Sequence, residues 1–374
     1  MSLTTASQDQ RPTITFGMLG YGFMGKAHSN ALKTLPYMFW PKSAQCRLAA
    51  ISGRNETSVS EAATRFGWEK YTTDWQEIVA DKAIDVFVNV GPDDLHYEPS
   101  LAALRAGKHV VCEKPLGNWT EARTLAHEAE KAGTLNLTCF NYRFLPAVRL
   151  AYEMIKGGEL GEIFSANFRY SQDWHTDPTA EFGNKTGALD VIGSHAIDAA
   201  RFLLGEVDSV SALMTNPRTS PPRGEPIDTV DALAQFSGGS TGTISATLIA
   251  PGRKNRLSWE INGSKGSVFW DLENLNILNY FNRNGSKTEG FTEIIVNEAH
   301  HTLVENWWPS AHVLGWEHAH INMYAHFVES LLAGASSVGP EGATFADGAA
   351  AARVGAAIHK ATETNQRVLI SDIV

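Results

Sequence analysis

The sequence predicts an α/β protein in two parts, a parallel sheet covered by helices on both faces and then an α+β part with an open, mostly antiparallel sheet. Over residues 13–140, apolar strands alternate with helical stretches, which is typical of parallel sheets with right-handed crossovers. A glycine-rich turn joins the first strand to the first helix. After Arg143 the pattern changes to long strands of alternating polarity joined by hairpin turns. We therefore predict one domain over 13–143 and a second over 144–374.

The elements of the first domain follow from its apolar runs and from the helical spacing between them. The first strand is marked by the apolar residues Ile14, Phe16 and Met18, and it runs directly into the glycine-rich turn. Strands with apolar residues at successive positions are expected where a sheet is buried on both faces. We predict further strands at 47–52, 69–72, 84–90, 109–112 and 135–140, and helices at 27–35, 56–66, 97–106 and 120–132.

The second domain begins with one more helix and continues in strands of alternating polarity. Ser237-Gly238-Gly239-Ser240 separates two such strands and is a hairpin signal, and Asn262-Gly263 marks another turn. Two helical stretches, the second rich in alanine, close the chain. We predict strands at 163–170, 229–236, 241–249 and 257–261, and helices at 147–156, 321–332 and 345–361.

Composition excludes several classes of protein. Lys and Arg total 31 against 41 Asp and Glu, and the net charge of −10 argues against a nucleic-acid surface. No apolar run approaches the roughly 18 residues of a membrane-spanning helix, and the polar segment 1–12 lacks the apolar core of a secretory signal. Three widely spaced cysteines without a Cys-x-x-Cys pair favour a reducing compartment over a disulfide framework or a zinc cluster. We expect a cytoplasmic protein with no membrane partner, no nucleic acid and no metal.

The segment Gly20-x-Gly22-x-x-Gly25 matches the phosphate-binding turn of a Rossmann dinucleotide-binding domain. In such a turn the first glycine permits the tight bend, the second lets a pyrophosphate approach the backbone, and the third lets the helix pack closely on the strand. The N–H groups at the start of the following helix would then face the phosphates. We expect Gly20, Gly22, Phe23, Met24 and Gly25 to bind the dinucleotide.

The end of the second strand bears on the choice between NAD and NADP. A carboxylate at this point would bind the ribose 2′-hydroxyl of NAD, but the sequence has Ser52-Gly53-Arg54 instead. Ser52 and Arg54 can hold a 2′-phosphate. Arg54 can equally stack on the adenine, and Glu56 can still reach the ribose. We expect NADP or NAD as the cofactor, with NADP favoured.

Two later motifs, together with the glycine turn, resemble a known family. The strand at 84–90 ends in Gly91-Pro92-Asp93-Asp94-Leu95-His96, and the strand at 109–112 leads into Glu113-Lys114-Pro115. Further on, Gly193-x-His195-x-x-Asp198 follows at the start of a helix. This combination resembles the Gfo/Idh/MocA oxidoreductases, named for glucose–fructose oxidoreductase, inositol dehydrogenase and MocA, from about Thr13 to the C-terminus.

The resemblance implies the fold, the activity and several site residues. It implies a Rossmann domain, a C-terminal domain with an open sheet, and NAD(P)-dependent oxidation of a sugar or cyclitol hydroxyl. Lys114 matches the family's catalytic lysine, and Pro92, His96 and Glu113 join it as cofactor-binding candidates. The chemistry agrees, because a hydride leaves a carbinol carbon readily only if the hydroxyl proton departs too, and this requires a base or a polarising group.

His195 matches the family's proton-handling histidine, but the aspartate expected four residues before it is displaced. Position 191 holds valine and the carboxylate stands at Asp190. An offset of five turns a side chain about 100° further round an α-helix than an offset of four. Either the backbone here is irregular enough for Asp190 to reach the pocket, or the aspartate's role is lost and Asp190 caps a helix or faces solvent. We retain Asp190 as a catalytic candidate with Lys114 and His195.

Several aromatic and polar residues resemble a narrower branch of the family, the levoglucosan and glucoside 3-dehydrogenases. A sugar presents an apolar C–H face and a rim of hydroxyls, so aromatic rings flanked by polar side chains suit it. Alternatively, each tryptophan is a core or dimer-interface residue. The histidines near the C-terminal tryptophans lack the spacing of a tetrahedral metal site. The substrate-binding candidates are Gln172, Asp173, Trp174 and Trp308.

These inferences lead to one functional hypothesis and two alternatives. We predict an NAD(P)-dependent dehydrogenase acting on a hydroxyl of a sugar, anhydrosugar, glucoside or cyclitol, plausibly at carbon 3 of a pyranose. One alternative is a sugar lyase or hydrolase that oxidises its substrate transiently and retains its cofactor. The other is a catalytically silent nucleotide-sensing module in which Val191 marks lost catalysis. The open sheet face favours a homodimer or a homotetramer.

Overall fold

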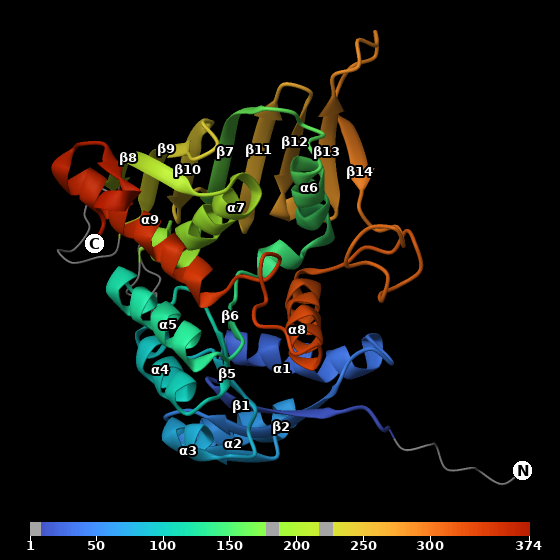
Figure 1. Ribbon diagram of the computed structural model, residues 1–374, viewed down its shortest axis with the longest axis vertical. Helices are drawn as coiled ribbons and strands as arrows, with labels where there is room; N and C mark the ends of the chain where they lie inside the picture. Colours follow the sequence, from blue (N-terminus) through green and yellow to red (C-terminus); the bar gives the residue numbers. More distant parts are fainter. Residues whose placement is uncertain (1–8, 177–186, 217–226) are drawn as a thin grey trace, which may run out of the picture.

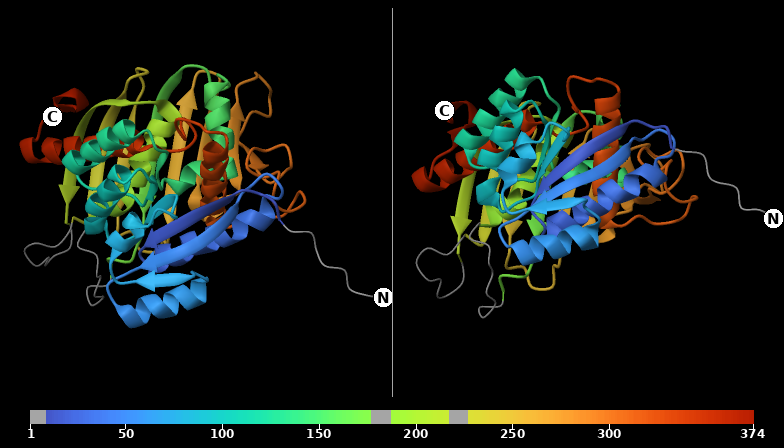
Figure 2. Two further views of the ribbon diagram at one scale, coloured as in Figure 1. Left: turned by 60° about the horizontal axis from the view of Figure 1, so that its bottom comes forward. Right: turned by 90° about the horizontal axis from the view of Figure 1, so that it is seen from below.

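The computed structural model describes residues 9–176, 187–216 and 227–374, and it contains two sheets (Figures 1 and 2). The first sheet is parallel throughout, with strand order β3-β2-β1-β4-β5-β6, which is the order of a Rossmann fold. The predicted fold class is therefore confirmed for the first part of the chain. Its strands are β1 Thr13–Leu19, β2 Gln45–Ser52, β3 Lys70–Thr72, β4 Val86–Asn89, β5 His109–Cys112 and β6 Asn136–Thr138.

Helices cover both faces of this sheet. The core on one face combines Phe16 and Val86 with residues of α1 Phe23–Met38 and α2 Glu56–Phe66. The core on the other face lies under α3 Trp75–Ala80, α4 Tyr97–Arg105 and α5 Trp119–Ala132. A late helix, α8 Trp316–Leu332, also packs on α1 and adds Ile321 and Phe327 to the first of these cores. The chain thus returns to its first sheet, and a division at 143/144 stays a prediction.

The second sheet has nine strands in the order β14-β13-β12-β11-β7-β10-β9-β8-β15. Only β7 and β10 pair in parallel; every other pair is antiparallel, as predicted for this part of the chain. Its strands are β7 Ile163–Ser171, β8 Val207–Thr215, β9 Thr229–Phe236, β10 Thr241–Thr247, β11 Arg256–Gly263, β12 Gly266–Asp271, β13 Ile277–Asn282, β14 Thr292–Ile295 and β15 Val368–Leu369.

One face of this sheet is covered and the other is open. Three helices, α6 Pro146–Lys156, α7 Ser194–Leu204 and α9 Phe345–Thr364, lie on the covered face, which is turned toward the first domain (Figures 1 and 2). Large apolar side chains remain exposed on the sheet's strands, with 63% of Leu213 and 64% of Leu233 accessible. The predicted open sheet is therefore present.

In the part of the chain that the structure describes, no helix has the length and apolar character needed to cross a membrane.

The fold brings the carboxyl ends of β1, β4 and β5 to the edge of the first sheet where ligands of such folds bind. The segment just before α7 meets this edge, because Nζ of Lys114 donates a hydrogen bond of 2.8 Å to the carbonyl oxygen of Val191. A short 3₁₀ turn, η2 Asn141–Phe144, connects β6 to α6 at the same place. The candidate site therefore lies between the two sheets.

Candidate active site

The glycine turn has the geometry that a pyrophosphate requires. Gly20 has φ +107°, and a Cβ there would lie 2.4 Å from the carbonyl oxygen of Val90. A Cβ on Gly25 would lie 2.6 Å from the carbonyl oxygen of Gly20, whereas one on Gly22 would meet no atom within 4 Å. Gly22 is also the N-cap of α1 and offers no side chain, so no capping side chain competes for the first N–H groups of the helix. The turn fits a dinucleotide.

The end of β2 supports only part of the predicted 2′-phosphate site. Ser52 is fully buried, and its hydroxyl donates to the carbonyl oxygen of Met18 at 3.4 Å, so this hydroxyl does not face a cofactor. Arg54 is exposed and available. Tyr21 packs over Gly53, where a Cβ would lie 2.1 Å from Cε1 of its ring. The structural support for binding NADP therefore rests on Arg54 alone.

The other cofactor candidates divide into exposed and internal residues. Phe23 is 71% exposed and stacks on Trp316 of α8, with ring centroids 5.4 Å apart, and Pro92 is exposed at the end of β4. Met24 packs partly buried against the core below. His96 is buried, and its two ring nitrogens lie 2.6 Å from the carbonyl oxygen of Pro115 and 3.0 Å from that of Gly91. His96 thus holds the loops after β4 and β5 together instead of facing the cofactor.

Lys114 and His195 come together as the sequence predicted. Lys114 is half-buried and donates to the carbonyl oxygen of Val191, which lies just before α7 and four residues before His195. The imidazole of His195 packs among the rings of Tyr142, Phe140 and Tyr170, with centroids 4.7, 5.9 and 5.9 Å away. Burial, and then the positive charge of Lys114, hold the pKa of His195 well below its usual range. His195 is therefore neutral at physiological pH and lies within the field of Lys114.

The backbone before His195 is irregular, which was one of the two outcomes considered for Asp190. Leu189–Gly193 forms a π-helical turn in which the N–H of Ser194 donates to the carbonyl oxygen of Leu189, five residues earlier. Such turns are rare and occur frequently at functional sites. Because the turn joins residues five apart, the rotation of about 100° away from the expected aspartate position, which an α-helix would impose on Asp190, does not apply here. Burial raises the pKa of the Asp190 carboxyl, and the charges of His359 and Lys114 act against this rise.

A chain of hydrogen bonds links two of the substrate candidates to the His195 pocket. Nε1 of Trp174 donates to Oε1 of Gln172 (2.5 Å), and Nε2 of Gln172 donates to Oδ1 of Asn255 (2.7 Å). The same Oδ1 accepts from the hydroxyl of Tyr170 (2.6 Å), which lies 3.0 Å from the hydroxyl of Tyr142. Tyr142 is the ring nearest to His195. The structure thus connects Gln172 and Trp174 with the predicted catalytic histidine.

Tyr142, Tyr170 and Asn255 also belong to this group, and we did not predict them from the sequence. The position of Tyr142, four residues after the last strand of a Rossmann sheet, was the available signal, because the carboxyl edge of such a sheet carries the site. Tyr170 and Asn255 lie on or beside neighbouring strands of the second sheet, β7 and β11. Their approach depends on strand register, which the sequence does not display.

Two other substrate candidates are engaged elsewhere. The carboxylate of Asp173 accepts from Nζ of Lys254 at 2.6 Å and from the backbone N–H of Gly252 at 3.2 Å. Trp308 packs beside Trp307, whose ring contacts Phe39 just after the last residue of α1, at the opposite end of that helix from the glycine turn. The structure therefore does not bring Trp308 to the group around Lys114.

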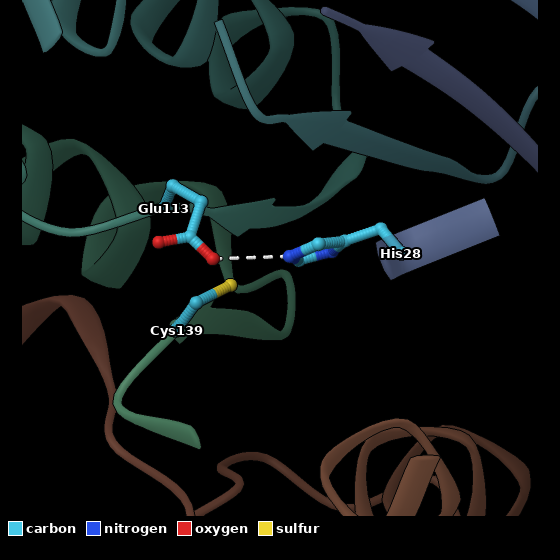
Figure 3. A group of neighbouring side chains, drawn as sticks. All are labelled: His28, Glu113 and Cys139. Atoms are coloured by element: carbon cyan, nitrogen blue, oxygen red, sulfur yellow. Dashed lines mark hydrogen bonds and ion pairs between the residues drawn. The ribbon is translucent and has the colours of Figure 1, made fainter. Parts of the chain in front are cut away.

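Glu113 belongs to a buried polar cluster below the site, shown in Figure 3 with His28 and Cys139. Nε2 of His28 lies 3.0 Å from Oε1 of Glu113, and Nδ1 of His28 lies 2.7 Å from the hydroxyl of Tyr324. The three candidate ligand atoms of the cluster lie within 4.8 Å of one another. Burial, and then the charge of Glu113, raise the pKa of the Cys139 thiol well above its usual range, whereas a cysteine binds metal as the thiolate. The hydrogen bonds already use both nitrogens of His28, so this geometry favours a hydrogen-bonded cluster.

The cluster makes the protein sensitive to acid. Burial alone would raise the pKa of Glu113, but the hydrogen bond and charge of His28 outweigh it and lower the pKa from 4.5 to about 2. Burial, and then the charge of His28, lower the pKa of the neighbouring His320 from 6.5 to about 3. Each depressed pKa means that the unfolded chain binds a proton that the folded chain does not, below pH 6.5 for His320 and below pH 4.5 for Glu113. The free energy of unfolding should therefore fall by several kcal/mol, in order of magnitude, between pH 6.5 and 3.

Urea denaturation at a series of pH values measures this dependence. His320→Phe should flatten the curve between pH 6.5 and 4.5 and leave, below pH 4.5, only the part of the fall that Glu113 causes. A wild-type stability that stays constant from pH 7 to 4 would show that these buried groups titrate normally in the folded protein.

The fold and the site together define a nucleotide-dependent oxidoreductase, with a Rossmann phosphate turn and a lysine–histidine pair facing it from two domains. Family models agree: residues 14–139 match the oxidoreductase family with an NAD-binding Rossmann fold, and residues 148–269 match the GFO/IDH/MocA C-terminal domain. The chain belongs to the Gfo/Idh/MocA oxidoreductase family.

Similar proteins refine this assignment. Levoglucosan dehydrogenase of Pseudarthrobacter phenanthrenivorans is 35% identical over 366 residues, covering 90% of this chain and 92% of that protein. Inositol 2-dehydrogenase of Rhizobium meliloti is 30% identical and covers 68% of this chain and 75% of that protein. A solved structure of levoglucosan dehydrogenase in complex with NADH superposes with a TM-score of 0.91 at 33% identity, covering 96% of this chain and 99% of that one. This chain is accordingly an NAD(P)-dependent dehydrogenase of the sugar and cyclitol class.

Proposed function

We propose that this dehydrogenase oxidises a ring hydroxyl of a pyranose-type sugar, with an anhydrosugar such as levoglucosan as the first candidate substrate. The observation that carries the proposal is the meeting of Lys114 and His195 at the carboxyl edge of the Rossmann sheet, linked through Tyr142 to the polar chain ending at Gln172 and Trp174. The likeness to levoglucosan dehydrogenase over nine-tenths of the chain supports the choice of substrate. We further propose that the hydroxyl at carbon 3 of the pyranose ring is the one oxidised.

The chain's own residues supply binding and proton handling. Bound NAD(P) supplies the hydride acceptor. Nζ of Lys114 lies at the end of β5, where it can hydrogen-bond the reacting hydroxyl and take or polarise its proton. The neutral imidazole of His195 offers a second hydrogen-bonding group from α7 to the same hydroxyl or its neighbour. The indole of Trp174 offers an apolar face to the C–H side of a sugar, and the amide of Gln172 hydrogen-bonds the hydroxyls at the rim of the sugar.

A panel of sugars tests the proposal. Purified protein is assayed for NAD(P)H formation with levoglucosan, glucose, aryl glucosides and inositols, each with NAD and with NADP. We expect levoglucosan or another pyranose to give the highest kcat/KM. If only inositols are turned over, the substrate is a cyclitol and not a sugar. If no compound gives net NAD(P)H formation, the proposal is contradicted, and a lyase that retains its cofactor is favoured.

Cofactor preference depends on Arg54 in this account. Arg54→Ala should raise the Kd of NADP by about 10-fold while changing the Kd of NAD less than threefold, because a guanidinium–phosphate contact contributes more than stacking alone. Cofactor titrations followed by protein fluorescence measure both constants, and Arg65→Ala, which changes an exposed arginine in the last turn of α2, serves as the control. A wild-type protein that binds NAD and excludes NADP would show that Arg54 does not face the 2′ position.

We also propose a homo-oligomer and a cytoplasmic location. The open face of the second sheet, with Phe164, Leu213 and Leu233 more than half exposed, is an apolar surface of the kind that symmetric dimers bury. The three cysteines are free thiols, which supports a reducing compartment. Sedimentation velocity of the wild type and of Leu233→Glu tests the interface.

A further inference from the structure

A cavity lies next to the lysine–histidine pair but outside the group that faces the sugar. It has about 220 Å³ of space open to water, and its walls are the loop Pro115–Trp119, the π-helical turn and the inner side of α9. Pro115 directly follows Lys114, and Asp190 directly precedes Val191, whose carbonyl oxygen holds Nζ of Lys114. The cavity wall therefore includes a residue next to Lys114 in the chain and a residue next to its hydrogen-bond partner.

Two ionisable side chains line this mainly apolar cavity. Asp190 is half-buried, and His359 of α9 is exposed to solvent. Of the charged groups acting on Asp190, His359 is the strongest and Lys114 and Asp93 are the others. The space exceeds many times the roughly 10–15 Å³ that one water requires, and these two polar side chains provide its hydrogen-bond partners.

Oxidation of an alcohol leaves one proton in the site at each turnover. The carbinol carbon gives up its hydrogen with the electron pair to the nicotinamide, and the hydroxyl gives up its proton to a basic group as the carbonyl double bond forms. That basic group must return the proton to solvent before the next cycle. His195 is poorly suited to store it, because burial keeps its imidazole neutral.

We propose that Asp190 and His359 form the proton exit of this enzyme: the proton passes from Lys114 through water to the carboxylate of Asp190, across the cavity water to His359, and from there to solvent. The inference rests on the proposed function. It also gives a role to the displaced aspartate, since the π-helical turn places Asp190 in the wall of the cavity.

The electrostatics of Asp190 suit a transient carrier. Burial raises the pKa of its carboxyl above the usual value of 3.8, and the nearby Asp93 raises it further, while His359 and Lys114 lower it. A carboxylate that is easier to protonate than a free aspartate accepts a proton from Lys114 more readily, and the field of His359 favours its release.

Single-turnover kinetics with the best sugar of the panel test this route. Formation of reduced nicotinamide is followed by absorbance, and proton release is followed in weak buffer with a pH-indicator dye. In His359→Gln we expect an unchanged rate of hydride transfer in the first turnover, proton release slowed by about 10-fold or more, and recovery on adding imidazole. His127→Gln, an exposed histidine on the neighbouring α5, should match the wild type.

Filling the cavity is a second, independent test. A Cβ at Gly355 of α9 would meet only Cδ2 of Leu189, at 4.0 Å, so a larger side chain can enter the space. Gly355→Leu should slow proton release as His359→Gln does, but without rescue by imidazole, and Gly355→Ala should behave as the wild type. Asp190→Asn should slow it as well.

The possible results distinguish a failure of the proton exit from a failure of the proposed function. A wild type that reduces no cofactor with any sugar contradicts the proposed function and the exit with it. An active wild type whose proton release is equally fast in His359→Gln and Gly355→Leu refutes the exit alone and leaves Lys114 and His195 in place. Loss of hydride transfer in His359→Gln without imidazole rescue would assign His359 a structural role instead.

Discussion

Lys114→Met is expected to lower kcat by a factor of about 10²–10⁴, with little change in the Kd of the cofactor. Lys114 stands at the end of β5, donates to the carbonyl oxygen of Val191, and acts electrostatically on His195. Methionine preserves much of the side chain's length and apolar stem but removes the group that takes or polarises the hydroxyl proton. The effect should therefore appear in turnover and not in cofactor binding.

A matched variant tests whether Lys114 acts by moving a proton or only by its positive charge. Lys114→Arg keeps a positive charge that cannot be given up near neutral pH, so its activity should stay close to that of Lys114→Met if Lys114 moves a proton. Steady-state rates and fluorescence titration of the cofactor provide both readouts. A Lys114→Met enzyme with near-normal kcat would overturn the catalytic assignment.

Arg143→Met is expected to destabilise the folded protein by about 3–5 kcal/mol. The guanidinium of Arg143 in η2 binds the carboxylate of Asp198 in α7 at 2.6 Å, and both side chains are almost fully buried, at 3% and 4% exposure. Asp347 of α9 lies 3.5 Å from the same guanidinium. Removing the arginine leaves a buried carboxylate without its main partner, at the point where η2, α7 and α9 meet.

Two comparisons test whether the loss of stability comes from the unpaired, buried carboxylate of Asp198. Asp198→Leu combined with Arg143→Met should recover much of the stability, because no unpaired carboxylate remains. Arg253→Met breaks the more exposed pair with Glu273, 2.9 Å apart, and should change the free energy of unfolding by less than about 1 kcal/mol. Urea denaturation measures all three variants, and equal effects of Arg143→Met and Arg253→Met would contradict the role of burial.

The sequence was sufficient to predict the fold because the patterns that mark its elements each lie within a short stretch of the chain. Apolar strands, the glycine turn and the hairpin signals each depend on a few adjacent residues, and the connection rules of α/β folds then fix the arrangement. The return of α8 to the first sheet was not predictable in this way. Its packing against α1 joins residues about 300 positions apart, such as His28 and Tyr324, and no local pattern marks that contact.

The site was predictable only where a motif fixes the backbone. Lys114, His195 and the glycines lie at strand or helix ends, so their neighbourhood follows from the topology. The direction in which a side chain points does not follow: Ser52 turns into the sheet, and His96 bonds two loops. The position of Asp190 depends on a π-helical turn, which differs from an α-helix by one extra residue. The displaced carboxylate left an irregular backbone as one of two alternatives, and the residue types did not decide between them.

Transfer of deuterium tests the central claim most directly. A sugar of the panel that carries deuterium at the reacting carbinol carbon is turned over, and the released cofactor is analysed by mass spectrometry. We expect one deuterium in each reduced nicotinamide, formed in equal amount to the oxidised sugar, and formed more slowly by a factor of about 10²–10⁴ in Lys114→Met. Sugar conversion with no deuterated cofactor in solution, and with the label retained in the product, would contradict it and identify a transient oxidation on a retained cofactor.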